Sequence, residues 1–229
     1  MNAVKLKDQI GYWDIYYNNH NVPLEPTSFA KYCLPLIKKK SNFLELGCGN
    51  GRDSIFFAKN NMSVVASDIS KIAIENLKKT VPASVMKNLK LLNEDFTNFE
   101  EEKFPGYFDT IYSRFTLHTI LKNKLDKVLN WSFKSLHSDG LFLIETRSTK
   151  DPLFSSGTGK LIDKNTFLYE EGHLRHFIDR QELEKKITNT GFSLEEVTES
   201  NNLSILGNDN PFLLRVVARK KARKLIDKI

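Results

Sequence analysis

The amino-acid sequence predicts an α/β fold with a doubly wound, mostly parallel sheet of seven strands. Three observations lead to this prediction. Short apolar runs typical of buried strands alternate with segments of helical spacing as far as residue 144. A glycine-rich turn follows the first of these strands and leads into a helix. The last two expected strands have no helix between them, so the final strand should run antiparallel to its neighbours.

Apolar spacing and helix-end residues place the individual elements. An N-terminal helical segment is expected within residues 1–40, with one helix over 27–37. Strands are expected at 42–46, 63–69, 89–92, 108–113, 141–144, 192–198 and 212–219. Further helices are expected from Arg52, after the N-cap residue Ser70, over 122–137 and from Asp179 to Gly191. Residues 149–178 lack such spacing, and long irregular insertions are often lids, so we predict a lid on the substrate side.

Length and composition indicate one cytoplasmic domain. The 229 residues suit a single α/β domain, and the net charge of +6 is only mildly basic. Part of that charge lies in the run 219–224, which has no interleaved aromatic residues and is interpreted as a solvated tail rather than a nucleic-acid site. Cys33 and Cys48 make no disulfide framework, and neither a signal peptide nor a bilayer-spanning run is found. We expect a monomer or homodimer with a small-molecule substrate, and no metal, membrane or nucleic-acid partner.

The most informative stretch is the turn over 44–53, which reads Leu-Glu-Leu-Gly-Cys-Gly-Asn-Gly-Arg-Asp. Its glycines allow positive φ and let a ligand contact the backbone. The helix that follows offers free N–H groups and the positive end of its dipole. This geometry suits a cofactor that carries a negative charge or a carboxylate.

Three features distinguish this turn from a dinucleotide-binding one. The spacing is Gly-x-Gly-x-Gly rather than Gly-x-Gly-x-x-Gly. Asp68 ends the second strand, seventeen residues after Gly51, where its carboxylate can accept hydrogen bonds from both hydroxyls of a ribose. Asp95 and Phe96 follow the third strand, where a carboxylate and a ring suit the amino group and the face of an adenine. Glu94 is the alternative to Asp95.

On these residues the sequence resembles the class I methyltransferases, which have a Rossmann-like fold and use S-adenosylmethionine (SAM), leaving S-adenosylhomocysteine (SAH). The run Gly-Cys-Gly-Asn-Gly-Arg-Asp-Ser is similar to the small-molecule branch, which includes thiopurine and tellurite-resistance methyltransferases. The resemblance implies contacts to the methionine part from Gly47, Gly49 and Gly51, to the ribose from Asp68, and to the adenine from Ile69, Asp95 and Phe96. Glu45 would orient the loop and the cofactor's amino group, or simply cap the turn.

The full set expected to contact the cofactor is Trp13, Tyr17, Glu45, Gly47, Cys48, Gly49, Gly51, Arg52, Asp53, Asp68, Ile69, Asp95, Phe96 and Ser113. Cys48 is interpreted as a small side chain at a tight position rather than a nucleophile. Trp13, Tyr16 and Tyr17 share one helical face and would place aromatic surface near the sulfonium. Packing of this N-terminal helix on the sheet is the alternative.

Candidate acceptor-side residues follow the fourth and fifth strands and lie in the predicted lid, so they should converge beyond the carboxyl ends of the strands. Arg114, Arg147 and Arg175 suggest a pocket for a phosphate or carboxylate, and structural ion pairs to Asp109, Glu145 or Asp151 are the alternative. His118, His173 and His176 are candidates for a general base, with a packing role as the alternative. The surrounding Ser-Arg-Phe-x-Leu-His and Gly-His-x-Arg-x-Phe patterns also resemble methyltransferases associated with surface-polysaccharide modification.

The expected activity is methyl transfer from SAM to an O or N atom of a small anionic metabolite or polysaccharide precursor. SAM is an activated donor, so alignment of the reactants matters most, and a base is needed only when the acceptor must lose a proton early. The Asn/Asp-Pro-Pro-aromatic tetrapeptide used on amines of bases or glutamine is absent. The alternatives are an RNA or protein methyltransferase, an NAD(P)-dependent oxidoreductase and a non-enzymatic SAM-binding protein.

Overall fold

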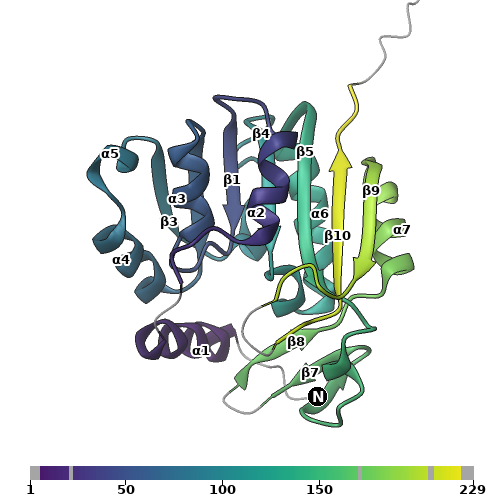
Figure 1. Ribbon diagram of the computed structural model, residues 1–229. Helices are drawn as coiled ribbons and strands as arrows, with labels where there is room; N and C mark the ends of the chain where they lie inside the picture. The colour runs from purple at the N-terminus through teal and green to yellow at the C-terminus, as the bar shows by residue number, and fades with distance from the viewer. Residues whose placement is uncertain (1–5, 21–22, 170–171, 206–208, 223–229) are drawn as a thin grey trace, which may run out of the picture.

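The computed structural model describes residues 6–20, 23–169, 172–205 and 209–222. Its centre is a seven-stranded sheet in the order β3-β2-β1-β4-β5-β10-β9 (Figure 1). The strands are β1 (Asn42–Leu46), β2 (Ser63–Asp68), β3 (Leu89–Asn93), β4 (Phe108–Arg114), β5 (Leu136–Arg147), β9 (Ser193–Ser200) and β10 (Leu213–Arg219). β1 to β5 are parallel, while β10 is antiparallel to both β5 and β9. The predicted doubly wound sheet with an antiparallel last strand is therefore confirmed.

Helices cover both faces of this sheet (Figure 1). They are α2 (Ser28–Cys33), α3 (Arg52–Lys59), α4 (Lys71–Thr80), α5 (Ala83–Met86), α6 (Lys122–Ser135) and α7 (Arg180–Thr190), while α1 (Leu6–Asn19) lies at the edge of the sheet. The alternating side chains of β1 show how two cores form, because Phe43 packs with α2, α3 and α4, whereas Leu44 and Leu46 pack with α6 and α7. None of the described helices is long and apolar enough to span a membrane.

Two elements differ from the prediction because apolar spacing does not report backbone ends. The helix expected over 27–37 ends at Cys33, and a 3-10 turn, Leu34–Leu36, follows because Pro35 lies within it. The strand expected at 141–144 is longer, since β5 begins at Leu136 directly after α6. Its polar residues 137–139 are exposed, and Asp139 N–H donates to the backbone oxygen of Lys220. This extension has no apolar alternation that would reveal it.

The predicted lid, residues 149–178, is not irregular. Outside residues 170–171, which lie beyond the described part, it holds a 3-10 turn and an antiparallel sheet of β6 (Lys160–Asp163), β7 (Thr166–Leu168) and β8 (Leu174–His176). The rings of Phe154, Phe167 and Phe177 lie 5.5–5.9 Å apart and form its small core. Strands of three or four residues are too short for periodicity to detect. The last two residues of the predicted basic run 219–224 also lie outside the described residues.

Helix α1 lies at the carboxyl edge of the parallel strands, between α4 and the small sheet (Figure 1). Asp14 accepts hydrogen bonds from Ser70 Oγ (2.6 Å) and Ile72 N (3.3 Å) at the N-terminus of α4, where a negative charge suits the helix dipole. At its other end, Gln9 Nε2 donates to the backbone oxygen of Gly172 at 2.7 Å. The helix therefore covers the edge where ligands of such sheets bind, rather than packing on a face of the sheet.

Candidate active site

The glycine-rich turn connects β1 to α3 with three residues of positive φ. Gly47, Gly49 and Gly51 have φ values of 67°, 55° and 77°. Cys48 N–H donates to the backbone oxygen of Ser67 at 2.9 Å, which ties the turn to the end of β2. A Cβ on Gly47 would overlap Thr116, and one on Gly49 would overlap the hydroxyl of Tyr17. The turn is thus a tightly enclosed cradle that only glycine allows.

Asp68 ends β2 directly beside this turn. Its side chain accepts hydrogen bonds from Gly49 N (2.7 Å) and Ser70 N (2.8 Å), and the residue is 6% exposed. Burial raises the pKa of the Asp68 carboxyl to about 6, although the two backbone N–H groups oppose that shift. A buried carboxylate is therefore held against the turn, as its place at the strand end predicts.

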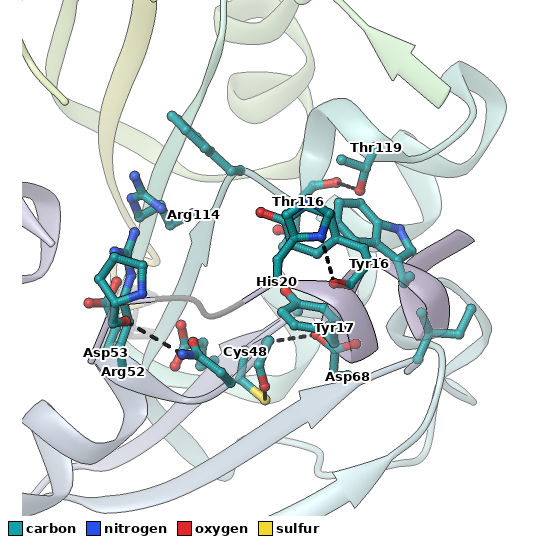
Figure 2. A pocket seen from close by; sticks show the side chains of 18 of the residues that line it. Tyr16, Tyr17, His20, Cys48, Arg52, Asp53, Asp68, Arg114, Thr116 and Thr119 are labelled. Atoms are coloured by element: carbon teal, nitrogen blue, oxygen red, sulfur yellow. Dashed lines mark hydrogen bonds between the residues drawn. The ribbon is translucent and has the colours of Figure 1, made fainter. Parts of the chain in front are cut away.

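A cavity of about 360 Å³ opens over the turn and Asp68 (Figure 2). Thirteen of the twenty-one residues predicted from sequence line it: Trp13, Tyr16, Tyr17, Glu45, Gly47, Cys48, Gly49, Arg52, Asp53, Asp68, Ile69, Phe96 and Arg114. Sequence reasoning missed His20, Pro23, Asn50, Thr116, Thr119, Ser204 and Asp209, which also line it. Its volume falls in the range of small-molecule sites.

A second, smaller cavity of about 80 Å³ adjoins the first, since Trp13, Ile69, Phe96 and Thr119 line both. Asp95 lines this second cavity, whereas Glu94 pairs with Lys103. The Asp95 carboxylate accepts hydrogen bonds from Thr97 N, Thr97 Oγ1 and Asn98 Nδ2 at 2.8–2.9 Å. These bonds fix its orientation, and they favour Asp95 over Glu94 as the residue that would contact an adenine.

Two buried acids beneath the larger cavity have structural partners. Asp53 accepts hydrogen bonds at 2.8 Å from Thr27 N, Thr27 Oγ1 and Tyr112 Oη, so it joins α2, α3 and β4. Glu45 accepts a hydrogen bond from Ser54 Oγ, and burial raises its pKa well above the usual value. The hydrogen bond from Ser54 therefore supports the alternative in which Glu45 caps the turn.

Two predicted cofactor residues lie away from the cavity lining. Gly51 is the N-cap residue of α3, and a Cβ there would overlap Leu77 of α4. Close packing against Leu77 therefore explains why this position is a glycine. Ser113 is fully buried, with its Oγ in hydrogen-bond contact with Thr116 Oγ1. Ser113 thus supports Thr116, which does line the cavity.

The arginines that end β4 and β5 have carboxylate partners. Arg114 Nε lies 3.1 Å from Glu145 Oε1, and Arg215 Nε lies 2.6 Å from the other oxygen of the same carboxylate. Arg147 pairs with Asp151 at 2.8 Å and Asp209 at 2.5 Å. The ion-pair alternative therefore describes both Arg114 and Arg147, although Arg114 also faces the cavity (Figure 2). Arg52, which lines the cavity too, has no ion pair with the described residues.

The three predicted histidines do not line either cavity. His118 is 3% exposed, and burial, followed by the charges of Arg147 and Arg175, lowers its pKa well below the usual value. Its Nδ1 accepts a hydrogen bond from Arg147 N at 3.4 Å. Burial likewise lowers the pKa of His173 to about 3 and of His176 to about 4. A histidine that holds protons this weakly is a poor general base at neutral pH.

His20 is the histidine that lines the larger cavity among the described residues (Figure 2). Its Nδ1 lies 2.9 Å from the backbone oxygen of Tyr16. A carbonyl oxygen accepts only, so Nδ1 carries the hydrogen and Nε2 keeps its lone pair in the neutral ring. The ring stacks on Tyr16 at 4.5 Å, one turn earlier on α1. Its position four residues after Tyr16 continues the aromatic face and was the available sequence signal.

The predicted aromatic residues of α1 face the same cavity. Trp13, Tyr16 and Tyr17 all line it, and the Tyr17 hydroxyl lies over Gly49. Burial, followed by the negative charge of Asp68, raises the pKa of the Tyr17 phenol well above the usual value. The phenol therefore stays protonated beside the carboxylate and supplies a hydrogen-bond donor and an aromatic wall.

Comparisons with known proteins identify the family of this chain. A family model described as a methyltransferase domain matches residues 19–197. The chain is 34% identical over 91 residues to an uncharacterised methyltransferase of Schizosaccharomyces pombe, covering 39% of this chain and 60% of the relative. It is 34% identical over 67 residues to a tRNA/tmRNA (uracil-C(5))-methyltransferase of Vibrio atlanticus, covering 28% of this chain and 18% of the relative. It thus spans less than two thirds of either curated relative.

A solved structure of similar shape is the 1,6-didemethyltoxoflavin-N1-methyltransferase of Burkholderia thailandensis, crystallised with 1,6-didemethyltoxoflavin and SAH. It has a TM-score of 0.74 and 15% identity, and the match covers 97% of this chain and 92% of that one. At this identity the match shows a shared fold. Because the family model spans most of the chain, the resemblance inferred from the glycine-rich turn is confirmed: the protein belongs to the methyltransferase-domain family.

Proposed function

We propose that this protein transfers the methyl group of SAM to an O or N atom of a small molecule that carries an anionic group. The observation that carries the proposal is a single cavity lined by two sets of residues. The glycine turn and Asp68 line it, and so do Arg114, Phe115 and His20. Cofactor and acceptor would therefore share one enclosed space, which is what direct displacement requires.

The residues of the cavity suit SAM in charge and shape. Asp68 would accept the ribose hydroxyls, and Asp95, Phe96 and Ile69 would enclose the adenine. Arg52, a cation without an ion pair among the described residues, would hold the amino-acid carboxylate. Because Gly47 and Gly49 have no Cβ, Thr116 and Tyr17 pack directly against the backbone of the turn, and all four residues line the cavity. When bound, SAM supplies an activated methyl group on a sulfonium.

The acceptor side supports a small molecule rather than a polymer. The segment between β9 and β10 brings Ser204 and Asp209 to the cavity, and α1 covers it from the opposite side with Tyr16 and His20. Arg114 Nη2 donates to Ser204 Oγ at 3.1 Å, which holds that segment against β4. The toxoflavin methyltransferase of similar fold was crystallised with a small heterocycle, which is consistent with such an acceptor.

The test separates this function from its alternatives by binding and by turnover. Calorimetric titration should show binding of SAM and SAH but not of NAD, whereas NAD binding alone would favour an oxidoreductase. Transfer of labelled methyl groups should then occur to hydroxy- or amino-substituted carboxylates and phosphates, and not to their uncharged esters. Transfer to RNA but to none of the small molecules would contradict the proposal. Binding without transfer to any acceptor class would leave a SAM-binding protein without activity.

Cofactor affinity is expected to depend on pH through Asp68. The ribose hydroxyls need its ionised form, and its pKa in the free protein is about 6. The dissociation constant of SAH should therefore rise below pH 6, by up to about tenfold per pH unit. Folding raises the pKa of the Asp68 carboxyl, so the folded state binds its proton more tightly than the unfolded state does. The contribution of Asp68 to the free energy of unfolding therefore falls as pH rises from about 4 to 6, whereas the affinity for SAH rises. Titrations between pH 5 and 8 check this, and a flat affinity profile would refute it.

His20 is proposed to take the proton that the acceptor loses, on its Nε2 atom. The exposed ring can then pass that proton to solvent. His20→Gln should lower kcat by about 100-fold on an acceptor that must be deprotonated, with SAH affinity little changed. His137→Gln is the matched control, because His137 is exposed on β5 outside the residues that line the cavity. Equal kcat values for both variants would remove His20 from the reaction.

A further inference from the structure

A cluster of basic side chains lies where the small sheet meets η3 (Leu117–Thr119), outside the cavity described above. Arg175 of β8 and His173 just before it form its centre, with Arg175 Nη2 3.5 Å from His173 Nδ1. His118 of η3 lies beside Arg147 at the end of β5, since its Nδ1 accepts a hydrogen bond from Arg147 N at 3.4 Å, and the positive charges of Arg147 and Arg175 help to lower the pKa of both His118 and His173. The cluster therefore joins groups from three separate parts of the chain.

The cations of this cluster differ in how their charge is balanced. Arg147 has two carboxylate partners, Asp151 and Asp209. Asp151 is fully engaged, because it also accepts hydrogen bonds from Leu153 N (2.9 Å) and Phe212 N (3.2 Å). Arg175 pairs with no carboxylate among the described residues, and its guanidinium lies 5.1 Å from the centre of the Tyr169 ring. A partly buried cation thus remains without a counter-ion in the described part of the chain.

Three polar atoms around Arg175 are buried and form no hydrogen bond with the residues that the structure describes. They are Arg175 Nε, His173 Nε2 and the Tyr169 hydroxyl. Buried polar groups are nearly always satisfied in native proteins, so three unsatisfied atoms at one place indicate a missing partner. Arginine Nε–H and the tyrosine hydroxyl are donors, and His173 Nε2 becomes one when the ring carries its hydrogen there. The partner that fits donors beside an unbalanced positive charge is an anion with several acceptor oxygens.

Two aromatic rings connect this cluster to the cavity. Trp13 contacts the His173 ring at 5.5 Å, and Phe115 contacts the His118 ring at 5.3 Å. Both Trp13 and Phe115 also line the larger cavity. Phe115 holds a φ of 58°, a conformation that costs a non-glycine residue strain, so its placement between the two regions is specific. The cluster and the cavity thus share a wall.

We propose that Arg175, His173 and Tyr169 form an oxyanion-binding subsite that holds a phosphate or carboxylate group of the methyl acceptor. The inference rests on the proposed function, because it assumes that the acceptor's reactive atom lies in the adjoining cavity. The subsite anchors the acceptor by its charged end, and Trp13 and Phe115 pack against the part of the acceptor that lies between that end and the cofactor. The small sheet thereby selects anionic acceptors over neutral ones of the same shape.

The probes for this subsite are inorganic phosphate and acetate, titrated calorimetrically into the full chain with SAH bound and ionic strength held constant. At least one of the two anions should bind the unaltered protein, and which one binds more tightly identifies the group. Arg175→Gln should weaken that binding by about tenfold or more, as the loss of a charged hydrogen bond does. Arg180→Gln is the matched control, since Arg180 is exposed on α7 and pairs only with Glu184 among the described residues.

Two further measurements keep the outcome unambiguous. Without anion, Arg175→Gln should have the same thermal unfolding midpoint as the unaltered protein, and it should bind SAH with the same affinity. Both results would show that the variant folds with its cofactor cavity intact. His173→Gln should weaken anion binding as well, which covers the case in which Arg175→Gln fails to fold. Absence of binding of both anions to the SAH-bound protein, or equal binding by Arg175→Gln, would overturn the subsite. Failure to bind SAH would instead count against the proposed function.

Discussion

Replacement of Asp68 by alanine is expected to weaken SAH binding by at least about 100-fold. The carboxylate is buried, lines the cavity and would accept both ribose hydroxyls. Each hydrogen bond to a charged group contributes about 1.5–3 kcal/mol, so loss of two such bonds exceeds the roughly 2.7 kcal/mol that a hundredfold change requires. The variant also leaves Gly49 N–H and Ser70 N–H without their acceptor, so the glycine turn loses a support.

A matched control for this variant exists at the opposite end of the sheet. Asp109, near the start of β4, accepts a hydrogen bond from Asn42 N at 2.8 Å, but it does not line the cavity. Asp109→Ala should therefore keep the affinity for SAH even if the protein becomes less stable. Thermal unfolding of both variants separates loss of fold from loss of binding. Undiminished SAH affinity in a folded Asp68→Ala protein would contradict the assignment of the cofactor site.

The features that sequence predicted correctly are those that depend on neighbouring residues along the chain. Strand and helix periods report burial directly, so the order of elements through β5 followed from apolar spacing. The carboxyl ends of parallel strands meet at one edge, which predicts that Gly49 and Asp68 lie close together, and the structure shows a hydrogen bond between them. The α1 face of Trp13 and Tyr17 was also visible from helical spacing, and both residues line the cavity.

What sequence could not predict depends on long-range packing. Ser204 and Asp209 reach the cavity from a segment without periodicity, and only the pairing of β9 with β10 brings them there. For Arg114 and Arg147 the sequence left open an anion pocket or ion pairs to Asp109, Glu145 or Asp151. The fold pairs them with Glu145 and Asp151, and it adds Asp209 from the β9–β10 connection, which the sequence did not indicate. The unbalanced Arg175 became apparent only after these partners were assigned. Which arginines have a carboxylate partner depends on the tertiary structure, so the sequence alone does not show which of them remain without one.

Gly49→Ala is expected to weaken SAH binding by about 100-fold through a steric effect rather than a lost hydrogen bond. The new Cβ would overlap the hydroxyl and the ring of Tyr17, which lies over the turn. Either the turn or α1 must move to relieve this overlap. Hydrogen bonds of Asp14 with Ser70 and of Gln9 with the backbone of Gly172 hold α1 in place. Displacement of the turn misplaces both Gly49 N–H and the Asp68 carboxylate that accepts from it.

The chain offers a closely matched control for backbone strain. Gly106 has φ 56° against 55° for Gly49, and a Cβ there meets nothing within 4 Å. Both alanine variants therefore pay the same left-handed penalty, about 1–2 kcal/mol of stability, and only Gly49→Ala should lose cofactor affinity. In the Tyr17→Ala background, Gly49→Ala should cost far less affinity than alone, because residues in contact are not additive. Equal losses in both backgrounds would show that strain in the turn, and not its contact with Tyr17, governs cofactor binding. Loss of affinity in Gly106→Ala would show that left-handed backbone strain lowers affinity even outside the turn.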